Sequence, residues 1–385
     1  MKNDPKTKYR VFISYSHEDE GEVKILSEIL QENGLFPISD SKLPKGHGFH
    51  DQIKKLIEHA YVFIPIISNS SNKKGWVHEE IGYALAHNIP VLPVTIEEGA
   101  LPEDMLVELE AIRTDLKNGD ELKKQNGKNV LERELSNDNI KNLIRTSQNE
   151  SKRAKFECAY FHLERTMMLV DYSIDVRTLF PEQPKQFRQA GGLSSFHIPD
   201  SSPDGEEFKN RNLGSNERLD TLNQKLREER ILFEEFAKKW GFKIIINLDL
   251  KFNESKETKK NALTIRKSRL NTLLRFFHDL HKKPSEPGMK FEVLIDEHLD
   301  KRWNLIIVGD LFLAESLAGY QGQGLKQTMF TRHAATIKKQ IELFDTRFEE
   351  LKNKRSGNAS VEHAMAEIEY RLKEIEKDLR KLKPN

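Results

Sequence analysis

The run Tyr61–Ile67 (YVFIPII) constrains the fold of the N-terminal segment more than any other feature of the sequence. Its residues are almost continuously apolar, as expected for a central parallel strand that is covered on both faces. Apolar runs before and after it, Arg10–Tyr15 and Ile89–Ile96, alternate with helical patterns. Strands and helices that alternate at this spacing predict a doubly wound parallel α/β sheet.

Residues 1–147 are predicted to form this α/β domain. Two shorter runs, Leu35–Ile38 and Ala111–Leu116, bring the expected sheet to five strands. Apolar residues spaced by threes and fours predict the helices between them. These helices are expected at Gly21–Asn33, around Ile53–Ile57, at Trp76–His87 and at Val130–Ile144.

Residues 155–327 predict a separate α+β domain of no recognised family. A polar loop rich in glycine and serine, Gly191–Ser215, interrupts its patterns. We expect helices near Phe156–Val170, at Asn216–Trp240 and around Lys259–His281, and strands at Lys243–Leu250, Phe291–Asp296 and Asn304–Leu313.

Residues 328–385 carry apolar side chains at alternating spacings of three and four. The pattern covers two stretches, Ala334–Leu351 and Val361–Leu382, joined by a polar loop. Charged residues fill the other positions, as in a coiled coil. Two interpretations are open: a helical hairpin within one chain, or self-association through one or both helices.

Charge and cysteine content limit the class of protein. The chain has 62 basic and 61 acidic side chains, so no overall field attracts nucleic acid or anionic lipid. Cys158 is the single cysteine, which rules out an intrachain disulfide and fits a reducing compartment. The N-terminus lacks the apolar core of a signal peptide, and no apolar run is long enough to span a bilayer. We therefore expect a cytoplasmic protein without a membrane partner or a nucleic-acid site.

Candidate site residues follow the predicted strands. In parallel α/β sheets, ligands bind at the carboxyl ends of the strands. Tyr15 and Ser16 follow the first strand, and Asp40 follows the second. Trp76 and Glu80 lie one helical turn apart beyond the third strand, so both can face the same crevice. An aromatic ring beside a carboxylate suits a flat cationic ring that carries a ribose.

Four sequence motifs resemble those of TIR (Toll/interleukin-1 receptor) domains, in the same order and at the same spacing. They are FISYSHED at 12–19, DSKLPKG at 40–46, YVFIPIIS at 61–68 and WVHEEIGYALA at 76–86, followed by PVLPV at 90–94. The resemblance implies a flavodoxin-like, five-stranded parallel sheet. It points to the bacterial TIR domains that hydrolyse NAD⁺, which carry a glutamate four residues after a tryptophan.

The resemblance also implies roles for single residues. Glu80 would be catalytic: it would contact the nicotinamide ribose and stabilise positive charge as the glycosidic bond breaks. Trp76 would form an aromatic wall, and Tyr15 and Ser16 would line the same pocket. Glu79 lies about 100° round the helix from Glu80 and would point elsewhere.

The loop after the second strand would open and close the site in such a domain. Asp40 matches the aspartate at its start, and Lys42, Leu43 and Gly46 fall within it. Gly75, before the tryptophan, replaces the more usual serine or aspartate. No metal is expected, and NAD⁺ would be a substrate rather than a cofactor.

The expected function is therefore an NAD⁺ glycohydrolase that releases nicotinamide and ADP-ribose, or a cyclised ADP-ribose. The resemblance implies activation by assembly, through the TIR domain and the C-terminal helices, in antiphage defence or cell-death signalling. The middle domain would sense an unknown trigger. One alternative is a non-enzymatic adaptor or virulence scaffold that acts through TIR–TIR association. Another is a TIR enzyme that forms a cyclic-nucleotide messenger.

Weaker signals have simpler explanations. Gly319–Lys326 lacks the Gly-Lys-Ser/Thr ending of a phosphate-binding loop, so we expect a connector. Cys158 lies in an apolar, aromatic run and predicts a buried thiol. A set of charged residues in the middle domain predicts either a ligand pocket or solvated and internally paired charges: Arg165, Arg177, Arg188, His162 and Glu164.

Overall fold

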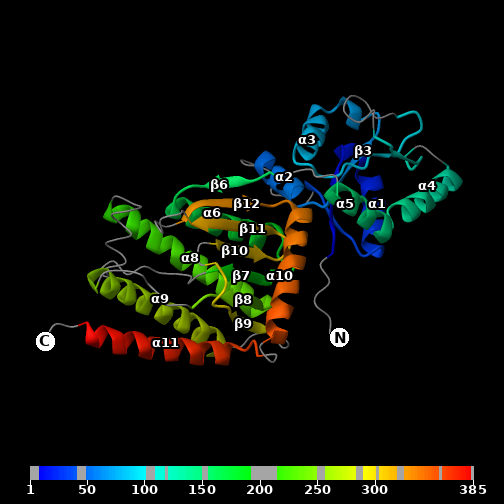
Figure 1. Cartoon of the computed structure of the whole chain (residues 1–385). Helices are drawn as coiled ribbons and strands as arrows, with labels where there is room; N and C mark the ends of the chain where they lie inside the picture. Colours follow the sequence, from blue (N-terminus) through cyan, green and yellow to red (C-terminus); the bar gives the residue numbers. More distant parts are fainter. Residues whose placement is uncertain are drawn as a thin grey trace. The chain divides into compact units, whose positions relative to one another are not determined.

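The computed structural model describes residues 8–40, 49–100, 109–117, 120–149, 155–191, 215–248, 256–282, 289–300, 303–318, 325–354 and 358–382. The chain forms two compact units, coloured along the sequence in Figure 1. The first unit comprises residues 1–155 with 332–338, and the second comprises 156–331 with 339–385. This division differs from the three predicted segments, because most of the C-terminal segment belongs to the second unit.

A parallel sheet in the order β2-β1-β3-β4-β5 forms the centre of the first unit. This order, with helices on both faces, confirms the predicted flavodoxin-like doubly wound fold. The strands are β1 (Arg10–Ser14), β2 (Phe36–Ile38), β3 (Val62–Ile67), β4 (Val94–Thr95) and β5 (Ile112–Arg113). The helices are η1 (His17–Asp19), α1 (Glu20–Glu32), α2 (Phe49–Glu58), η3 (Ser71–Lys73), α3 (Gly75–Ala86), α4 (Glu121–Glu134) and α5 (Asn137–Asn149).

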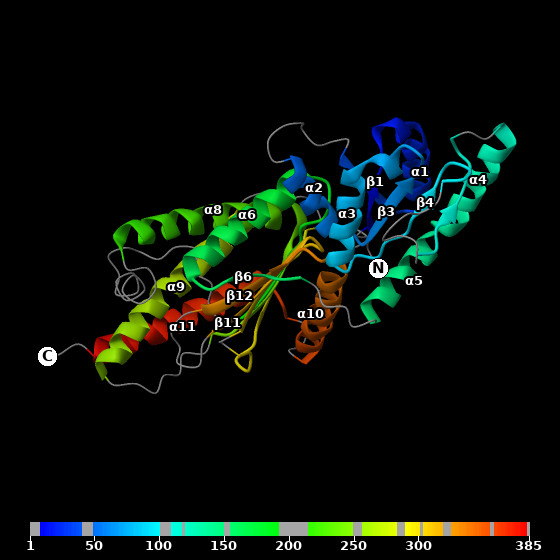
Figure 2. The same cartoon turned by 90° about the horizontal axis from the view of Figure 1, so that it is seen from above.

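Alternation along β1 assigns its side chains to the two faces of the sheet. Val11 and Ile13 belong to a core cluster with apolar residues of α1, α4 and α5. Phe12 points to the opposite face, where its ring stacks on Phe63 with 5.6 Å between centroids. Helices α2 and α3 cover this face (Figure 2). Ser14 is two residues after Phe12 and therefore shares the face that α3 covers.

The closing helix predicted at Val130–Ile144 is two helices, α4 and α5. The break falls at Leu135 and Ser136. The Asn139 side chain donates hydrogen bonds to the carbonyls of Arg133 and Glu134, which end α4. The Ser136 hydroxyl accepts from the Asn139 backbone at the start of α5. Side chains that bond to the backbone at helix ends offer an alternative to a continuous helix.

The second unit is built on a mixed sheet in the order β6-β12-β11-β10-β7-β8-β9. Strands β7, β8 and β9 are parallel, and the remaining pairs are antiparallel. The strands are β6 (Glu157–Ala159), β7 (Phe187–Gly191), β8 (Phe242–Ile246), β9 (Phe291–Ile295), β10 (Trp303–Val308), β11 (Phe312–Ala318) and β12 (Leu325–Thr331). The helices are α6 (His162–Leu179), α8 (Asn216–Trp240), α9 (Lys256–Lys282), α10 (Ala334–Lys354) and α11 (Val361–Lys381).

Neighbouring residues of β7, β8 and β9 form one apolar ladder and one charged ladder. Phe187, Phe242 and Phe291 are in register, with centroids of adjacent rings 5.2 and 5.1 Å apart. Phe187 also stacks on Phe233 of α8. The next residues, Arg188, Lys243 and Glu292, face the other way and pair with Asp345, Glu349 and Lys352 of α10. Helices therefore cover both faces of this sheet.

Two predictions for this unit were wrong in detail. The run Asn304–Leu313 is not one strand but the hairpin of β10 and β11, which turns at Gly309. Gly309 has a φ of +51°, and a Cβ there would collide with the Pro184 carbonyl, so the turn requires glycine. The helix predicted near Phe156–Val170 begins only at His162, after the short edge strand β6.

Some of the C-terminal heptad positions are buried within the chain itself. Phe344 and Phe348 of α10 and Ile368 and Ile375 of α11 are at most 5% exposed, whereas Ile341, Met365 and Leu372 are half-buried. Helix α11 lies along α9 (Figures 1 and 2). The apolar periodicity was therefore a correct sign of helices with one buried face, and their packing partner is the second unit. Within the described ranges, no helix combines the length and the apolar character that a bilayer span requires.

Candidate active site

Helix α3 holds Glu80 at the carboxyl edge of the first sheet. Val77, Ile81 and Ala84 are buried at spacings of four and three and fix one face of α3 against the sheet. Glu80 lies beside that face and is only partly exposed. Trp76, one turn earlier, projects from the same side of the helix. The position of Glu80 is thus set by the core rather than by a flexible loop.

The surroundings of Glu80 disfavour its charged form. Burial raises the pKa of Glu80 to about 7, and the nearby charges of Asp40 and Glu79 push it in the same direction, while Ser14 opposes them. Among the described residues, the charged groups that act on Glu80 are therefore both acids. A carboxylate in such a position gains most from a ligand that brings positive charge.

Ser14 is the last residue of β1 and lies close to Glu80. It is 2% exposed, and its hydroxyl lowers the pKa of Glu80 as a hydrogen-bond donor. Ser14 and Glu80 together provide a donor and an acceptor at the strand edge.

An aromatic series connects the loop after β1 to the start of α3. The ring centroids of Tyr15 and His17 are 6.1 Å apart, and those of His17 and Trp76 are 6.2 Å apart. The imidazole of His17 therefore stands between the two aromatic rings predicted for the site. His17 is exposed and Trp76 is half-buried, so both offer ring surface to a ligand.

The predicted site residues differ in whether they act on Glu80 and in how far they are exposed. Asp40 acts on Glu80, and Glu79 is exposed beside it. Tyr15 belongs to the core cluster on the α1 face, and it is 3% exposed. Ser16 is 1% exposed. The predicted loop residues Lys42, Leu43 and Gly46 lie outside the described residues.

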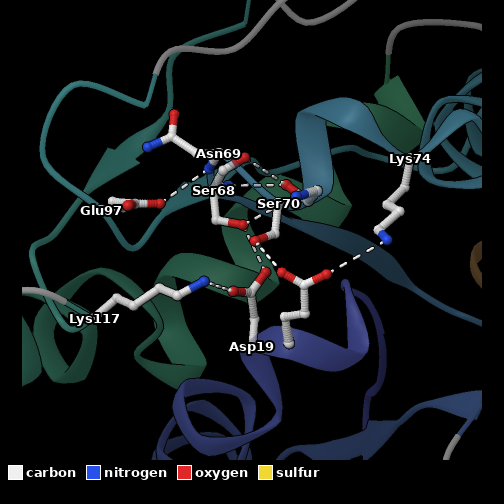
Figure 3. A network of polar contacts seen from close by, with 9 residues as sticks. Asp19, Ser68, Asn69, Ser70, Lys74, Glu97 and Lys117 are labelled. Atoms are coloured by element: carbon white, nitrogen blue, oxygen red, sulfur yellow. Dashed lines mark hydrogen bonds and ion pairs between the residues drawn. The ribbon is translucent and has the colours of Figure 1, made fainter.

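A polar network around Asp19 fixes the loops beside this site (Figure 3). Asp19 is fully buried and accepts hydrogen bonds from Ser68 Oγ at 2.6 Å and from Lys117 Nζ at 2.5 Å. These residues follow β1, β3 and β5, so one carboxylate joins three loops. Burial lowers the pKa of Lys117, but the hydrogen bond and charge of Asp19 outweigh it, and the pKa is raised overall.

The same network reaches the start of α3. Ser68 and Ser71 bond reciprocally, backbone to side chain, at 2.8 and 3.1 Å. Glu18 accepts from Ser70 Oγ at 2.6 Å, and Lys74 Nζ lies 3.5 Å from its other oxygen. These contacts connect η1, which carries His17, to the turn before α3, the helix that carries Trp76. Sequence analysis assigned no role to Asp19, Ser68 or Lys117.

Nothing in the described part of the chain resembles a metal centre. No three histidine, cysteine, aspartate or glutamate side chains in those ranges are grouped to hold an ion.

Comparison with known families assigns this unit. Residues 11–128 match the TIR domain family. The first unit is a TIR domain. The sheet order and the residues of the four motifs agree with this assignment.

Comparison with individual proteins adds little. A diflavin flavoprotein A3 from Nostoc sp. is 11% identical, over 38% of this chain and 100% of that chain, with a TM-score of 0.28. The TIR domains of the activated Roq1 resistosome are 19% identical, over 37% of this chain and 99% of that chain, with a TM-score of 0.22. Both scores are too low to support an inference. No curated protein matches the chain.

Proposed function

We propose that the TIR domain hydrolyses NAD⁺ at its nicotinamide glycosidic bond, with Glu80 as the catalytic carboxylate. The observation that carries the proposal is the placement of Glu80 at the carboxyl edge of the sheet, next to Ser14 and among acids. Neither neighbouring acid neutralises Glu80. The nicotinamide ring of NAD⁺ is a cation joined to a ribose, and it supplies the charge that this site lacks.

The reaction needs little from the protein beyond electrostatics. The bond between the ribose C1′ and the ring nitrogen breaks, and its electron pair leaves with the ring as neutral nicotinamide. The ribose then carries oxocarbenium-like positive charge, which the Glu80 carboxylate stabilises. Water adds at C1′ and loses a proton, which gives ADP-ribose. The hydroxyl of Ser14 is placed to donate a hydrogen bond to a ribose oxygen or to the carboxylate.

Trp76 and His17 would bind the nicotinamide ring of the substrate. The Trp76 ring lies in the first turn of α3, and the His17 ring lies beside it, with 6.2 Å between the ring centroids. Trp76 also projects from the same side of α3 as Glu80. A flat ring stacked on them would bring its glycosidic bond toward the carboxylate. Aromatic surfaces attract cations, and the effect is stronger where water is displaced.

Activation by assembly remains part of the proposal. An enzyme that consumes NAD⁺ must be inactive without its trigger, and contact between TIR domains is a suitable switch. The apolar faces of α10 and α11 are buried in the same chain, so assembly through these helices would require them to leave the second unit. We therefore favour the surface of the TIR domain as the assembly interface.

Nicotinamide release from NAD⁺ tests this function. Purified wild-type chain is compared with Glu80→Gln, and with Glu79→Gln as a matched control on the next, exposed residue. We expect the Glu80 variant to lose at least about 10²-fold in turnover and the Glu79 variant to retain it. Equal turnover in the wild type and Glu80→Gln would refute the assigned catalytic residue.

Protein concentration and product identity complete the test. Rate per molecule that rises with concentration supports activation by assembly, whereas full activity of a strict monomer at nanomolar concentration contradicts it. Chromatography of the product separates ADP-ribose from a cyclised form. No turnover at any concentration, with or without a crowding agent, would favour the non-enzymatic adaptor.

A further inference from the structure

Helices α6 and α8 of the second unit each place a charged residue in an otherwise largely apolar face. On α8, Glu229 lies in the row of Leu222, Leu226 and Phe233, and it is 5% exposed. On α6, Arg165 lies on the side that buries Leu169, and it is 9% exposed. The two helices pack against each other. Charged side chains are seldom buried so deeply unless they are paired.

Arg165 has no such pairing in the described part of the chain. Its Nε is buried without a hydrogen-bond partner, and no described carboxylate lies within ion-pair distance of its guanidinium. The other two arginines singled out in the sequence are paired. Arg177 lies 3.3 Å from Glu235, and Arg188 holds Asp345 by two bonds of 3.0 and 2.9 Å. Tertiary packing thus distinguishes Arg165 from the others.

Charged and titratable groups of both signs lie around Arg165, and the one that acts on it directly is Glu229. His162 begins α6 one turn earlier, and Arg269 of α9 lies near enough for its charge to act on His162. Burial, with the charges of Arg165 and Arg269, lowers the pKa of His162 to about 3, so this imidazole is neutral at pH 7. Arg165 attracts Glu229, but burial dominates and raises the pKa of that carboxyl to about 7. Near neutrality, Glu229 therefore balances only part of the positive charge.

We propose that Arg165 anchors a binding site for a phosphate-bearing small molecule where α6, α8 and α9 of the second unit meet, with His162 and Arg269 at its sides. A guanidinium presents parallel N–H groups that match two oxygens of a phosphate. Leaving such a group buried without a partner is costly. A phosphate would satisfy the donors that the protein leaves open. This site is separate from the proposed NAD⁺ chemistry and does not depend on it.

Glu229 makes the affinity of this site depend on pH. A phosphate next to Arg165 is repelled by an ionised Glu229 and tolerated by a protonated one. Ionisation of Glu229 above pH 7 should therefore weaken binding, while the ligand's own loss of a proton in this range acts in the opposite direction. The other charged group that acts on this carboxyl is Arg165, which stays protonated in this range.

Thermal unfolding with pyrophosphate or inorganic phosphate tests the site on the full chain. Sodium chloride of equal ionic strength is the reference, and the experiment is run at pH 6.5 and pH 8. Bound ligand raises the unfolding temperature in a saturable manner. We expect this at pH 6.5 for the wild type and for Arg177→Gln, whose arginine is exposed on the same helix, but not for Arg165→Gln. An equal response in both arginine variants, or none in the wild type, would overturn the proposal.

Glu229→Gln provides a second test that keeps Arg165 in place, should Arg165→Gln fail to fold. This variant should bind pyrophosphate at pH 8 about tenfold more tightly than the wild type, measured by titration calorimetry, and the two proteins should bind about equally at pH 6, where Glu229 is protonated. A difference between the two proteins that is the same at pH 6 and pH 8 would contradict the role of Arg165 and Glu229 as one site.

Discussion

Two carboxylates at the same edge of the TIR sheet, one buried and one partly exposed, have opposite surroundings. Asp19 is fully buried and bonded to Ser68 and Lys117. Glu80 stands among acids, with one serine hydroxyl nearby. The first arrangement joins three loops and is complete within the protein. The second is incomplete, because no positively charged group among the described residues acts on it. A group left in this state at a rigid edge is better explained by a ligand than by stability.

The largest effect should come from removing the satisfied carboxylate. Asp19→Ala leaves Lys117 and Ser68 without their acceptor, and we expect the free energy of unfolding of the TIR domain to fall by about 3 kcal/mol. Urea denaturation measures this. The control is Glu20→Gln on a nearby exposed residue of α1, which should change stability little. A loss for Asp19→Ala no greater than that of the control would mean that the network does not hold the loops.

Removing the unsatisfied carboxylate should have the opposite sign. The pKa of Glu80 is raised from 4.5 to about 7, so the folded state binds this proton more tightly than the unfolded state. Stability from this group is complete below pH 4.5 and is lost as the pH rises through 7. The full difference corresponds to roughly 3 kcal/mol, and partial exposure reduces it to about 2 kcal/mol. Glu80→Gln should therefore stabilise the TIR domain at pH 8 and have no effect at pH 4; destabilisation at pH 8 would contradict the comparison.

The pH dependence of kcat/KM should report the protonation of Glu80. If ionised Glu80 is required, kcat/KM for NAD⁺ should fall by about fivefold from pH 7 to pH 6, because this parameter reports the free enzyme. The nicotinamide cation favours the carboxylate, so the fall in kcat should occur at lower pH than the fall in kcat/KM. Initial rates of nicotinamide release across pH 5–8 measure both. A flat kcat/KM profile over this range would rule out Glu80 as the titrating group.

Local patterns predicted the scaffold but not the network. The apolar runs fixed the strands because buried parallel strands need apolar residues on both faces. The four-residue spacing of Trp76 and Glu80 was enough to place them on one side of a helix. Asp19 stands directly before α1, where an acidic residue is expected as a helix cap, so nothing in its local sequence indicates its role. Its partner Lys117 is 98 residues away, and only the folded sheet brings the two together.

Residues of the same type can also have different partners in the folded chain. Sequence analysis grouped Arg165, Arg177 and Arg188 together, yet the first is buried with an unpaired Nε and the other two are ion-paired. The heptad pattern predicted helices with a buried face but could not name the partner, because a chain's own sheet and a second helix require the same apolar face. Pairing and packing partners are properties of the tertiary structure, and a single sequence does not carry them.

The smallest effect should come from the acids around Glu80. Asp40→Asn removes a charge that helps to raise the pKa of Glu80, so the acid limb of the kcat/KM profile should move to lower pH by roughly half a unit. Glu79→Gln should move it less, because Glu79 is exposed and water screens its charge. The shift should shrink in 1 M salt for Glu79→Gln and persist for Asp40→Asn. A profile that moves to higher pH in Asp40→Asn would mean that Asp40 holds a cation near Glu80. Glu80 would then have a positively charged partner, as Asp19 has in Lys117, and the contrast between these two carboxylates would be lost.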